Sequence, residues 1–547
     1  NIGRSSIRYA IEYLPNNLRC FVWDDYPWKS LPSTFAPKML VHLQLKRSKL
    51  CYLWMETKHL PSLRRIDLSW SERLMRTPDF KRMPNLEYVN LNQCSNLEEV
   101  HHSLGCCSKL IGLYLNDCKS LKRFPCVNVE SLEYLNLYGC SSLEKFPEIH
   151  GRMKPEIQIH MLGSGIRELP SSIFQYQTHV TKLLLWDMKN LVALPSGICR
   201  LKSLVSLSVS GCSKLESLPE EIGDLDNLRV LLARDTMILQ PPSSIVRLNK
   251  LIILMFGGFD DGVHFEFPPV AEGLRSLEHL DLSYCNLIDG GLPEDIGSLS
   301  SLKKLDLGSN NFEHLPPSIA QLGALRSLDL KHCQRLTQLP ELPSELNELR
   351  VDCHMALKFI HDLVTKRKKL QRVKLDDAHN DTIYNLFAHA LFQNISSMRH
   401  DISASDSLSL RVFTGEPYPE KIPSWFHHQG WDSSVSLNLP ENWYIPDKFL
   451  GFAVCYSRSL IDTTTHLIPV CDDGMSCMTQ KLALSECDTE SSDYSECDIH
   501  FFFIPFAGLW DTSKANGKTP NDYGIIRLSF SGEMKMYGLH LLYKEGP

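Results

Sequence analysis

The sequence lacks long hydrophobic runs and has no large surplus of either charge. Its longest apolar stretches, residues 251–256 and 501–509, have the length of strands, whereas a membrane-spanning helix needs about 18 apolar residues or more. The 547 residues include 57 basic and 64 acidic ones, a formal charge of −7. We therefore expect no membrane span, and no nucleic-acid binding by the chain as a whole.

Motifs for metal or phosphate binding are also missing. No C-x-x-C pair occurs, and the cysteines and histidine between residues 471 and 500 are too irregularly spaced for a zinc site. Residues 517–519 read GKT, the end of a phosphate loop, but Thr512 stands where the first glycine of that loop belongs. We expect neither a metal nor a cofactor in this chain.

What the sequence does contain is a repeat. Residues 86–97 read LEYVNLNQCSNL, residues 132–143 LEYLNLYGCSSL and residues 325–336 LRSLDLKHCQRL. The shared pattern, L-x-x-L-x-L-x-x-C/N-x-L, is that of leucine-rich repeats. Fifteen units can be placed, with first residues at 18, 40, 63, 86, 110, 132, 156, 180, 204, 228, 251, 277, 302, 325 and 346.

The spacing of the leucines predicts an α/β solenoid over residues 18–355. Offsets +3 and +5 from the first leucine face the core of a short strand, and successive strands stack into a parallel concave sheet. The Leu-Pro steps after most units predict an irregular or short-helical convex side. Units 156 and 251 break the pattern and predict local irregularity.

The offset +8, which we call the ladder slot, accounts for one third of the 18 cysteines. A small side chain there can hydrogen-bond to neighbouring turns or fill a small buried pocket. The ladder residues are Cys94, Cys118, Cys140, Cys212, Cys285, Asn310 and Cys333. The cysteine count therefore favours a reducing compartment over a disulfide framework.

The repeat pattern stops near residue 355, and a different pattern of apolar residues follows. Residues 356–370 and 381–395 have apolar residues at helical spacing, which predicts a helical connector over 356–408. Short alternating strands then predict a mostly-β sandwich over 409–547. Because the chain begins at Asn1 without Met, we expect residues 1–17 to be a linker from an upstream domain.

Two stretches carry a family resemblance. The first units contain LVHLQLKRSKLCYLW (40–54) and LRRIDLSWSERLMRTPDF (63–80). The second region contains GEPYPEKIPSWFHHQGWDSSVSLNLPENWY (415–444) and DKFLGFAVCY (447–456). The first pair resembles the repeats of plant intracellular immune receptors of the TIR–NB–LRR class, and the second is similar to their jelly-roll/Ig-like post-repeat domain. Together the two matches extend over nearly the whole chain.

The resemblance implies a sensor and not an enzyme. It implies a partner, a pathogen effector of viral origin, and an autoinhibitory contact with the receptor's own nucleotide-binding domain. It further implies oligomerisation of the full receptor and a cytoplasmic or nucleocytoplasmic location. ADP, ATP and NAD would belong to the TIR and nucleotide-binding domains, which are not in this sequence.

The concave wall is the leading candidate for binding. Offsets +2, +4 and +6 face outward if +3 and +5 face inward, and Tyr and Trp are frequent in binding hot spots. The rule selects Tyr88, Asn90, Asn92, Tyr114, Asn116, Tyr134, Asn136, Tyr138, Lys182 and Trp186, and it predicts an acidic column at Asp281, Asp306 and Asp329. The alternative is that these are ordinary exposed strand residues.

Other candidates are weaker. Residues 366–369 are basic and fit either a solvated helix face or a phosphate-binding patch, and residues 485–498 read as an acidic loop. A Cys–His nucleophile at residues 101–107 would lie on the convex side, where no cleft is expected. Trp425 and Trp443 are either core residues or low-ranking partner contacts.

Two other functions stay open. An ectodomain of a cell-surface receptor would carry several glycosylation sequons in its repeats, but the two N-x-[ST] matches, at Asn380 and Asn394, lie outside them. A substrate-selecting adaptor of an enzyme complex would need a docking helix, and the sequence shows none.

Overall fold

The computed structural model describes most of the chain in two compact units, Asn1–Leu299 and Ser300–Pro547. The residues it describes are 12–154, 157–170, 172–175, 179–258, 263–271, 273–365, 370, 372–376, 381–398, 403, 407–414, 422–431, 434–457, 460–469, 478–483, 497–515, 517–532 and 536–544. The basic run 366–369, nearly all of the acidic stretch 485–498 and most of the linker 1–17 lie outside the described residues.

The first unit repeats one short parallel strand per turn. One parallel sheet consists of β1 (Cys20–Val22), β2 (His42–Gln44), β3 (Arg65–Asp67), β4 (Tyr88–Asn90), β5 (Gly112–Tyr114), β7 (Tyr134–Asn136) and β9 (Gln158–His160). A second run consists of β10 (Lys182–Leu184), β11 (Ser206–Ser208), β12 (Val230–Arg234), β13 (Ile253–Gly257) and β14 (His279–Asp281). The inward residue of each well-paired strand is a fully buried apolar side chain, such as Leu43, Leu135 or Leu207.

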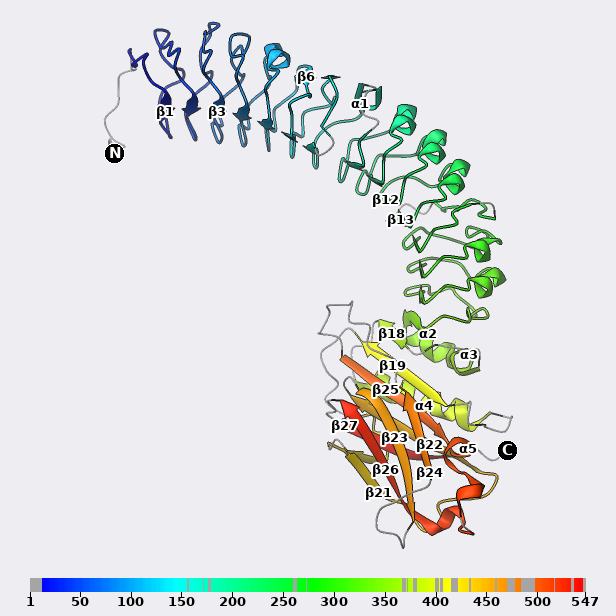
Figure 1. Cartoon of the computed structure of the whole chain (residues 1–547). Coiled ribbons are helices and arrows are strands. Elements are labelled where there is room, and N and C mark those ends of the chain that lie inside the picture. The colour runs from blue at the N-terminus through cyan, green and yellow to red at the C-terminus, as the bar shows by residue number, and fades with distance from the viewer. Residues whose placement is uncertain are drawn as a thin grey trace. The chain divides into compact units, whose positions relative to one another are not determined.

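The opposite side of many turns carries a short helix (Figure 1). These are η1 (His102–Cys106), α1 (Ser172–Gln175), η2 (Ser196–Arg200), η3 (Glu220–Asp224), η4 (Ser243–Arg247) and η5 (Ile296–Ser298), with the small pair β6 (Val127–Asn128) and β8 (Ile149–His150). Pro195, Pro219 and Pro242 cap three of them with φ between −68° and −60° and ψ of 145°. The Leu-Pro steps therefore lead the chain out of the core as an extended segment.

A left-handed residue precedes the ladder slot in almost every unit. The residues are Asp25, Arg47, Trp70, Gln93, Asp117, Gly139, Gly163, Asp187, Gly211, Asp235, Gly258, Tyr284, Ser309 and His332, with φ between 53° and 91°. This backbone conformation favours Gly, Asn and Asp, and Gly or Asp occupies most of these positions. The turn it makes is what brings the ladder residue inward.

The two predicted irregularities have different outcomes. Near unit 156 the strand order is interrupted, because β9 and β10 belong to separate sheets. Near unit 251 the pairing continues in register from β12 through β13 to β14, although Gly257 and Gly258 have positive φ. The missing ladder residue of unit 251 therefore does not break the sheet.

The second unit carries the repeat sheet into the β-sandwich. Strands β15 (Lys304–Asp306), β16 (Ser327–Asp329), β17 (Glu348–Asp352), β18 (Arg372–Asp376) and β19 (Leu408–Thr414) are parallel, with η6 (Pro317–Gln321) between β15 and β16. The same sheet then continues antiparallel through β25 (Cys497–Pro505), β22 (Phe449–Ser457), β27 (Met536–Tyr543) and β20 (His428–Gly430). Repeats and sandwich thus share one sheet.

A second antiparallel sheet completes the sandwich. It contains β21 (Ser434–Asn438), β26 (Tyr523–Gly532), β23 (Leu460–Pro469) and β24 (Met478–Ala483), with α5 (Phe506–Leu509), η8 (Thr512–Lys514) and η9 (Pro520–Asp522) at its connections. Buried residues from both sheets form one core, among them Phe452, Phe502 and Leu539 from the first sheet and Leu467 and Ile526 from the second.

The region predicted as a helical connector differs from that expectation. The first helix is split into α2 (Cys353–Lys358) and α3 (Ile360–Thr365), and α4 (Asp381–Ser396) matches the second. Between them lies a strand, β18, which pairs in parallel with β17 and β19. The physical reason is that Leu370, Val373 and Leu375 keep the repeat spacing, so their side chains are buried like those of a further repeat.

Candidate functional site: the concave face

Five side chains on adjacent strands of the first unit form a row, which we call the aromatic row: Arg65, Tyr88, Tyr114, Tyr134 and His160. The guanidinium carbon of Arg65 lies 4.6 Å from the centre of the Tyr88 ring. The Tyr114 and Tyr134 rings are 4.9 Å apart, and the Tyr134 and His160 rings are 5.1 Å apart. Such ring and cation contacts hold each aromatic face in place.

Gly112 makes the row continuous. A side chain at this position would lie 2.8 Å from the Tyr114 ring and 3.0 Å from the Tyr88 ring. Without it, both rings can lie over the Gly112 backbone. The environment of Tyr114 raises the pKa of its phenol, first through burial and then through Tyr134 and Tyr88, so the hydroxyl stays a neutral donor near pH 7.

The row extends beyond the predicted residues at both ends. Tyr88, Tyr114 and Tyr134 are half-buried, and Arg65 and His160 are exposed. Arg65 occupies offset +2 of its unit and His160 offset +4, the same outward columns that selected the tyrosines. A search of the outward offsets of every repeat for any side chain that can pack on a ring would have found both Arg65 and His160.

The asparagines of the candidate set mainly hold the loops. The Asn92 side-chain oxygen accepts the Asn116 N–H at 2.9 Å, and that of Asn136 accepts the Tyr138 N–H at 2.9 Å. Asn90 likewise accepts the Asn92 N–H at 3.1 Å, and the Asn116 amide donates to Asp117 at 2.7 Å. Each of these amides therefore has a local structural role, whatever else it contacts.

Tyr138, Lys182 and Trp186 lie beside the gap in the sheet. Tyr138 is 40% exposed and Trp186 49% exposed, and Lys182 is exposed on β10. All three line a cavity of about 720 Å³ that His160 also lines. The aromatic row thus leads directly into this cavity.

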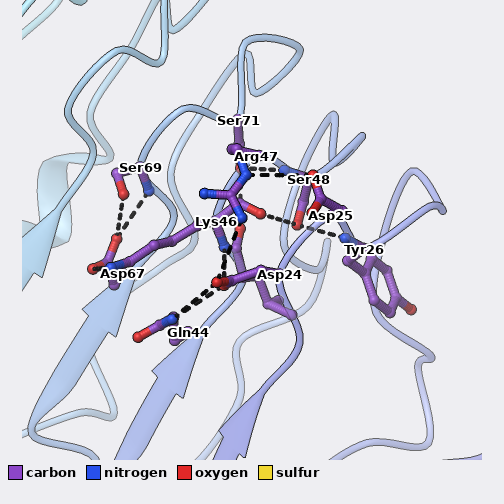
Figure 2. A network of polar contacts seen from close by, with 11 residues as sticks. Asp24, Asp25, Tyr26, Gln44, Lys46, Arg47, Ser48, Asp67, Ser69 and Ser71 are labelled. Atoms are coloured by element: carbon purple, nitrogen blue, oxygen red, sulfur yellow. Dashed lines mark hydrogen bonds and ion pairs between the residues drawn. The ribbon is translucent and has the colours of Figure 1, made fainter. Parts of the chain in front are cut away.

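Charged side chains in the first repeats of the solenoid are paired with one another, as Figure 2 shows. Asp24 accepts from the Gln44 amide at 3.1 Å, Arg47 lies 3.4 Å from Asp25, and Lys46 lies 3.3 Å from Asp67. These side chains come from neighbouring turns and link them. These contacts form a cross-linked polar network at the start of the solenoid.

The acidic column differs from its prediction as an exposed stripe. Asp281 is 3% exposed, and its carboxylate lies 2.6 Å from Arg234 and accepts two hydrogen bonds from Ser283. Asp281 is in the first unit, whereas Asp306 and Asp329 pair across β15 and β16 of the second.

Asp329 is also largely buried and internally paired. It is 8% exposed, accepts the Lys331 N–H at 2.9 Å and lies 3.5 Å from Arg350. Burial, and then the nearby Asp306, raise its pKa to about 6. The half-buried Asp306 accepts the Gly308 N–H at 3.0 Å. The two buried carboxylates are thus used inside the fold, because cationic side chains from other turns of the solenoid, Arg234 and Arg350, reach them.

The ladder residues lie in the core and link adjacent turns. The thiols of Cys94, Cys118, Cys140, Cys212 and Cys333 each donate to the backbone oxygen of a leucine in the preceding turn, at 3.0–3.3 Å. Cys285 is fully buried and Asn310 is 1% exposed, with its amide donating to Leu307 O at 2.7 Å. Burial raises the pKa of Cys94, Cys140, Cys212 and Cys333 to about 12, so these thiols stay protonated.

Serine occupies the ladder slot in two early units, which the cysteine pattern did not reveal. Ser71 donates to Leu45 O at 3.1 Å and accepts the Ser48 N–H at 3.2 Å. Ser48 in turn accepts the Tyr26 N–H at 3.1 Å. The Ser71 hydroxyl therefore has the same role as the ladder thiols, because it donates to the backbone of an adjacent turn as they do.

The two tryptophans of the second unit are packing residues in this structure. Trp443 is 2% exposed, donates to Tyr523 O at 2.8 Å and packs on Phe449 and Phe452. The half-buried Trp425 stacks on Phe392 of α4 at 5.0 Å. The proposed partner contact at Trp443 is therefore wrong, because its ring has almost no free surface.

Comparisons with known proteins match this architecture. A family model described as C-JID domain matches residues 418–547, one described as disease resistance protein RPS4B-like leucine-rich repeats matches residues 128–218, and a Leucine Rich Repeat model matches residues 276–299 and 301–322. TMV resistance protein N of Nicotiana glutinosa is 87% identical over 547 residues, which cover 100% of this chain and 48% of that protein. The chain corresponds to the repeat and post-repeat region of a plant disease-resistance receptor, in agreement with its resemblance to the TIR–NB–LRR class.

More distant members of this receptor class match as well. Disease resistance-like protein DSC1 of Arabidopsis thaliana is 35% identical, and disease resistance protein RPP2B of the same plant is 34% identical. Each alignment covers 83% of this chain and 38% of the relative. The chain thus spans less than half the length of these receptors and corresponds to their repeats and post-repeat domain.

This receptor region is not a catalytic domain, since its matches are to repeats and a C-JID domain. In the part of the chain that the structure describes, no group of three or more His, Cys, Asp or Glu residues could hold a metal ion. His101, from the Cys–His cluster on the convex side, caps η1 by accepting from Ser103, and burial raises the pKa of Cys107 to about 12. No helix among the described residues is long and apolar enough to cross a membrane.

Proposed function

We propose that this chain is the region with which a plant disease-resistance receptor recognises a pathogen effector protein, and that the aromatic row is the centre of the contact. The observation that supports this proposal is the ordered row itself: three tyrosines, an arginine and a histidine with accessible faces on neighbouring strands. Tyr and Arg are the residues that dominate binding energy in protein interfaces.

The size of the row is compatible with a protein partner. A stable interface buries about 800 Å² on each side, and adjacent parallel strands lie about 4.8 Å apart. The four steps from β3 to β9 therefore give a platform about 19 Å long, which suits the centre of such an interface. The name of the N. glutinosa relative, TMV resistance protein N, points to a protein of tobacco mosaic virus as the partner.

The remaining roles follow from the receptor class. The repeats and post-repeat domain hold the receptor's nucleotide-binding domain inactive until the effector binds, and the activated receptor oligomerises. ADP, ATP and NAD act in the nucleotide-binding and TIR domains, and this region takes no cofactor. The receptor works in the cytoplasm, or in the cytoplasm and nucleus. Asp306 and Trp425, which are both half-buried, are secondary surfaces in this proposal.

The cysteines favour this proposal over a cell-surface ectodomain. All fourteen cysteines whose state the structure describes are free thiols. A secreted repeat protein usually holds its ends with disulfides, because its environment is oxidising. No comparable observation supports the enzyme-adaptor alternative.

The test is co-precipitation of the 547-residue chain with proteins of tobacco mosaic virus, expressed one at a time. We expect one of them to bind the wild-type chain. The triple variant Tyr88→Ala, Tyr114→Ala and Tyr134→Ala should lose that binding by about a hundredfold or more, because three hot-spot aromatics at roughly 1–2 kcal/mol each amount to about 3 kcal/mol or more.

A matched control replaces two exposed aromatic residues outside the row. Tyr284 is 45% exposed and Trp431 is 72% exposed, so Tyr284→Ala with Trp431→Ala removes similar surface elsewhere. This control should bind as the wild type does, and all chains should unfold at similar temperatures. Equal binding by the triple variant and the wild type would show that the row is not the contact.

A further inference from the structure

The repeat sheet of the first unit is split between two neighbouring turns. Among the described residues, β9 is the last strand of one parallel sheet and β10 is the first strand of the next. On either side the pairing is regular: Tyr134 is in register with Gln158, and Lys182 with Ser206. Facing strand edges carry backbone N–H and C=O groups that no neighbouring strand satisfies.

The ladder changes at the same place. Ser164 occupies the ladder slot of the turn that contains β9, and its hydroxyl is buried with no hydrogen-bond partner in the described structure. The next slot holds Met188, whose thioether cannot donate a hydrogen bond. The donor-to-carbonyl link seen at Cys118, Cys140 and Cys212 is therefore missing between these two turns.

The split opens an apolar cavity of about 720 Å³, which we call the slot. Leu183 of β10, at the inward offset, is only half-buried, whereas Leu135 and Leu207 at the same offset have no exposure. Leu184 is 42% exposed and Leu162 36% exposed, and both line the slot. Its volume is within the range of ligand-binding pockets, so the slot holds more than one side chain of a partner.

One charge marks the slot. Of the residues that line the slot, Lys182 is the one with a permanently charged side chain. It is exposed at the centre of the split, on the first strand of the second sheet, and no salt bridge or side-chain hydrogen bond joins it to any described residue. A ligand that fills this slot gains from an apolar body and from a carboxylate near Lys182.

We propose that the slot takes an extended, apolar segment of the partner protein that carries an acidic residue opposite Lys182. An extended segment fits better than a helix, because its backbone can pair with the free edges of β9 and β10 while alternate side chains enter the slot. This inference rests on the proposed function, since it places part of the same partner beside the aromatic row through Tyr138 and His160.

The experiment uses the 547-residue chain and two synthetic hexapeptides, titrated by calorimetry. The first residue is glutamate in one peptide and lysine in the other. The remaining residues of both peptides alternate leucine and serine. The wild-type chain should bind the glutamate peptide about fivefold more tightly, the effect of roughly 1 kcal/mol from an exposed ion pair. The variant Lys182→Glu should reverse this preference.

Two matched controls separate the slot from the rest of the surface. Lys304 is an exposed lysine at the same strand offset of β15, so Lys304→Glu should leave the peptide preference unchanged. Leu184→Glu should weaken the glutamate peptide about tenfold, because it places a like charge in the apolar slot. Val192→Glu, at a 43% exposed residue outside the slot, should have no effect.

Two results would overturn the inference: failure of both peptides to bind at millimolar concentration, or an unchanged preference in Lys182→Glu. Its failure is distinct from failure of the proposed function. If the viral protein binds through the tyrosines but neither peptide binds, the slot is rejected and the aromatic row stands. If the charge swap succeeds but no viral protein binds, the slot stands and the proposed function is rejected.

Discussion

The aromatic row and the acidic residues both occupy outward columns of the repeat but have opposite roles. Tyr88 and Tyr134 stack on their neighbours and leave ring surface accessible, whereas Asp281 and Asp329 are at most 8% exposed and are bonded to side chains of the same chain. The two tyrosines occupy offset +2 and the two aspartates offset +4 of their repeats, and both offsets face outward from the core. What differs is whether the chain itself supplies a complementary group.

This difference teaches that an outward offset alone does not make a binding surface. A carboxylate next to a long cationic side chain is drawn into an internal pair, as Asp281 is by Arg234 across 47 positions of sequence. A tyrosine stacked on another tyrosine keeps much of its face free. Aromatic columns are therefore better candidates for partner binding than charged columns in this solenoid.

The largest effect expected from the comparison is on stability at Asp281. Asp281→Ala leaves Arg234 and the Ser283 hydroxyl without their partner in a nearly buried site, which should cost about 3 kcal/mol. Denaturant unfolding at pH 7 would measure it. Asp226→Ala, at an exposed carboxylate of the same unit, should change the free energy of unfolding by less than about 0.5 kcal/mol. If both substitutions changed the free energy of unfolding by the same small amount, Asp281 would be a surface residue without a stabilising internal partner.

A pH-dependent effect is expected at Asp329, whose folded-state pKa of about 6 lies above the ordinary value of 3.8. Below pH 3.8 the carboxyl is protonated in both states and contributes nothing. As the pH rises to 6, the unfolded chain releases this proton first, so the free energy of unfolding falls by up to about 3 kcal/mol.

The variant Asp329→Asn cannot ionise, so its stability relative to the wild type should rise between pH 4 and pH 7, as measured by denaturant unfolding at both values. Asp306→Asn removes the neighbouring negative charge and should reduce the wild-type slope without abolishing it. A slope in Asp329→Asn as steep as in the wild type would mean that Asp329 is not a buried, strained carboxylate.

Much of the fold follows from local sequence rules. The leucine spacing predicts the strands because each three-residue strand buries one leucine, and α4 (Asp381–Ser396) agrees with the helix predicted at 381–395. Strand β18 was missed because apolar residues at helical spacing extended to residue 370 and concealed a further repeat at Leu370, Val373 and Leu375. Two patterns competed there, and the pairing with β17 decided between them.

The site was only partly predictable. The outward columns selected the three tyrosines, because that selection depends on strand periodicity alone. Stacking and pairing depend on neighbours some 20 to 50 positions away, so neither the Tyr114–Tyr134 contact nor the Arg234–Asp281 pair can be read from a single unit. The split between β9 and β10 also depends on two neighbouring repeats together. The irregular repeat at residue 156 nevertheless predicted the place of the irregularity.

The most direct test of the central claim is the affinity of Gly112→Ala for the viral protein that the wild-type chain binds. The new methyl group would lie within 3.0 Å of the Tyr88 and Tyr114 rings, so it displaces the rings without removing any of them. Gly323→Ala is the matched control, since its nearest atom is 4.0 Å away.

Calorimetry should show the affinity of Gly112→Ala lowered by about tenfold, roughly 1.4 kcal/mol, with Gly323→Ala unchanged. Because the displaced atoms belong to partly exposed side chains and not to the backbone, both variants should unfold at nearly the wild-type temperature. Wild-type affinity in a folded Gly112→Ala chain would contradict the claim that the ordered aromatic row is the partner-binding surface.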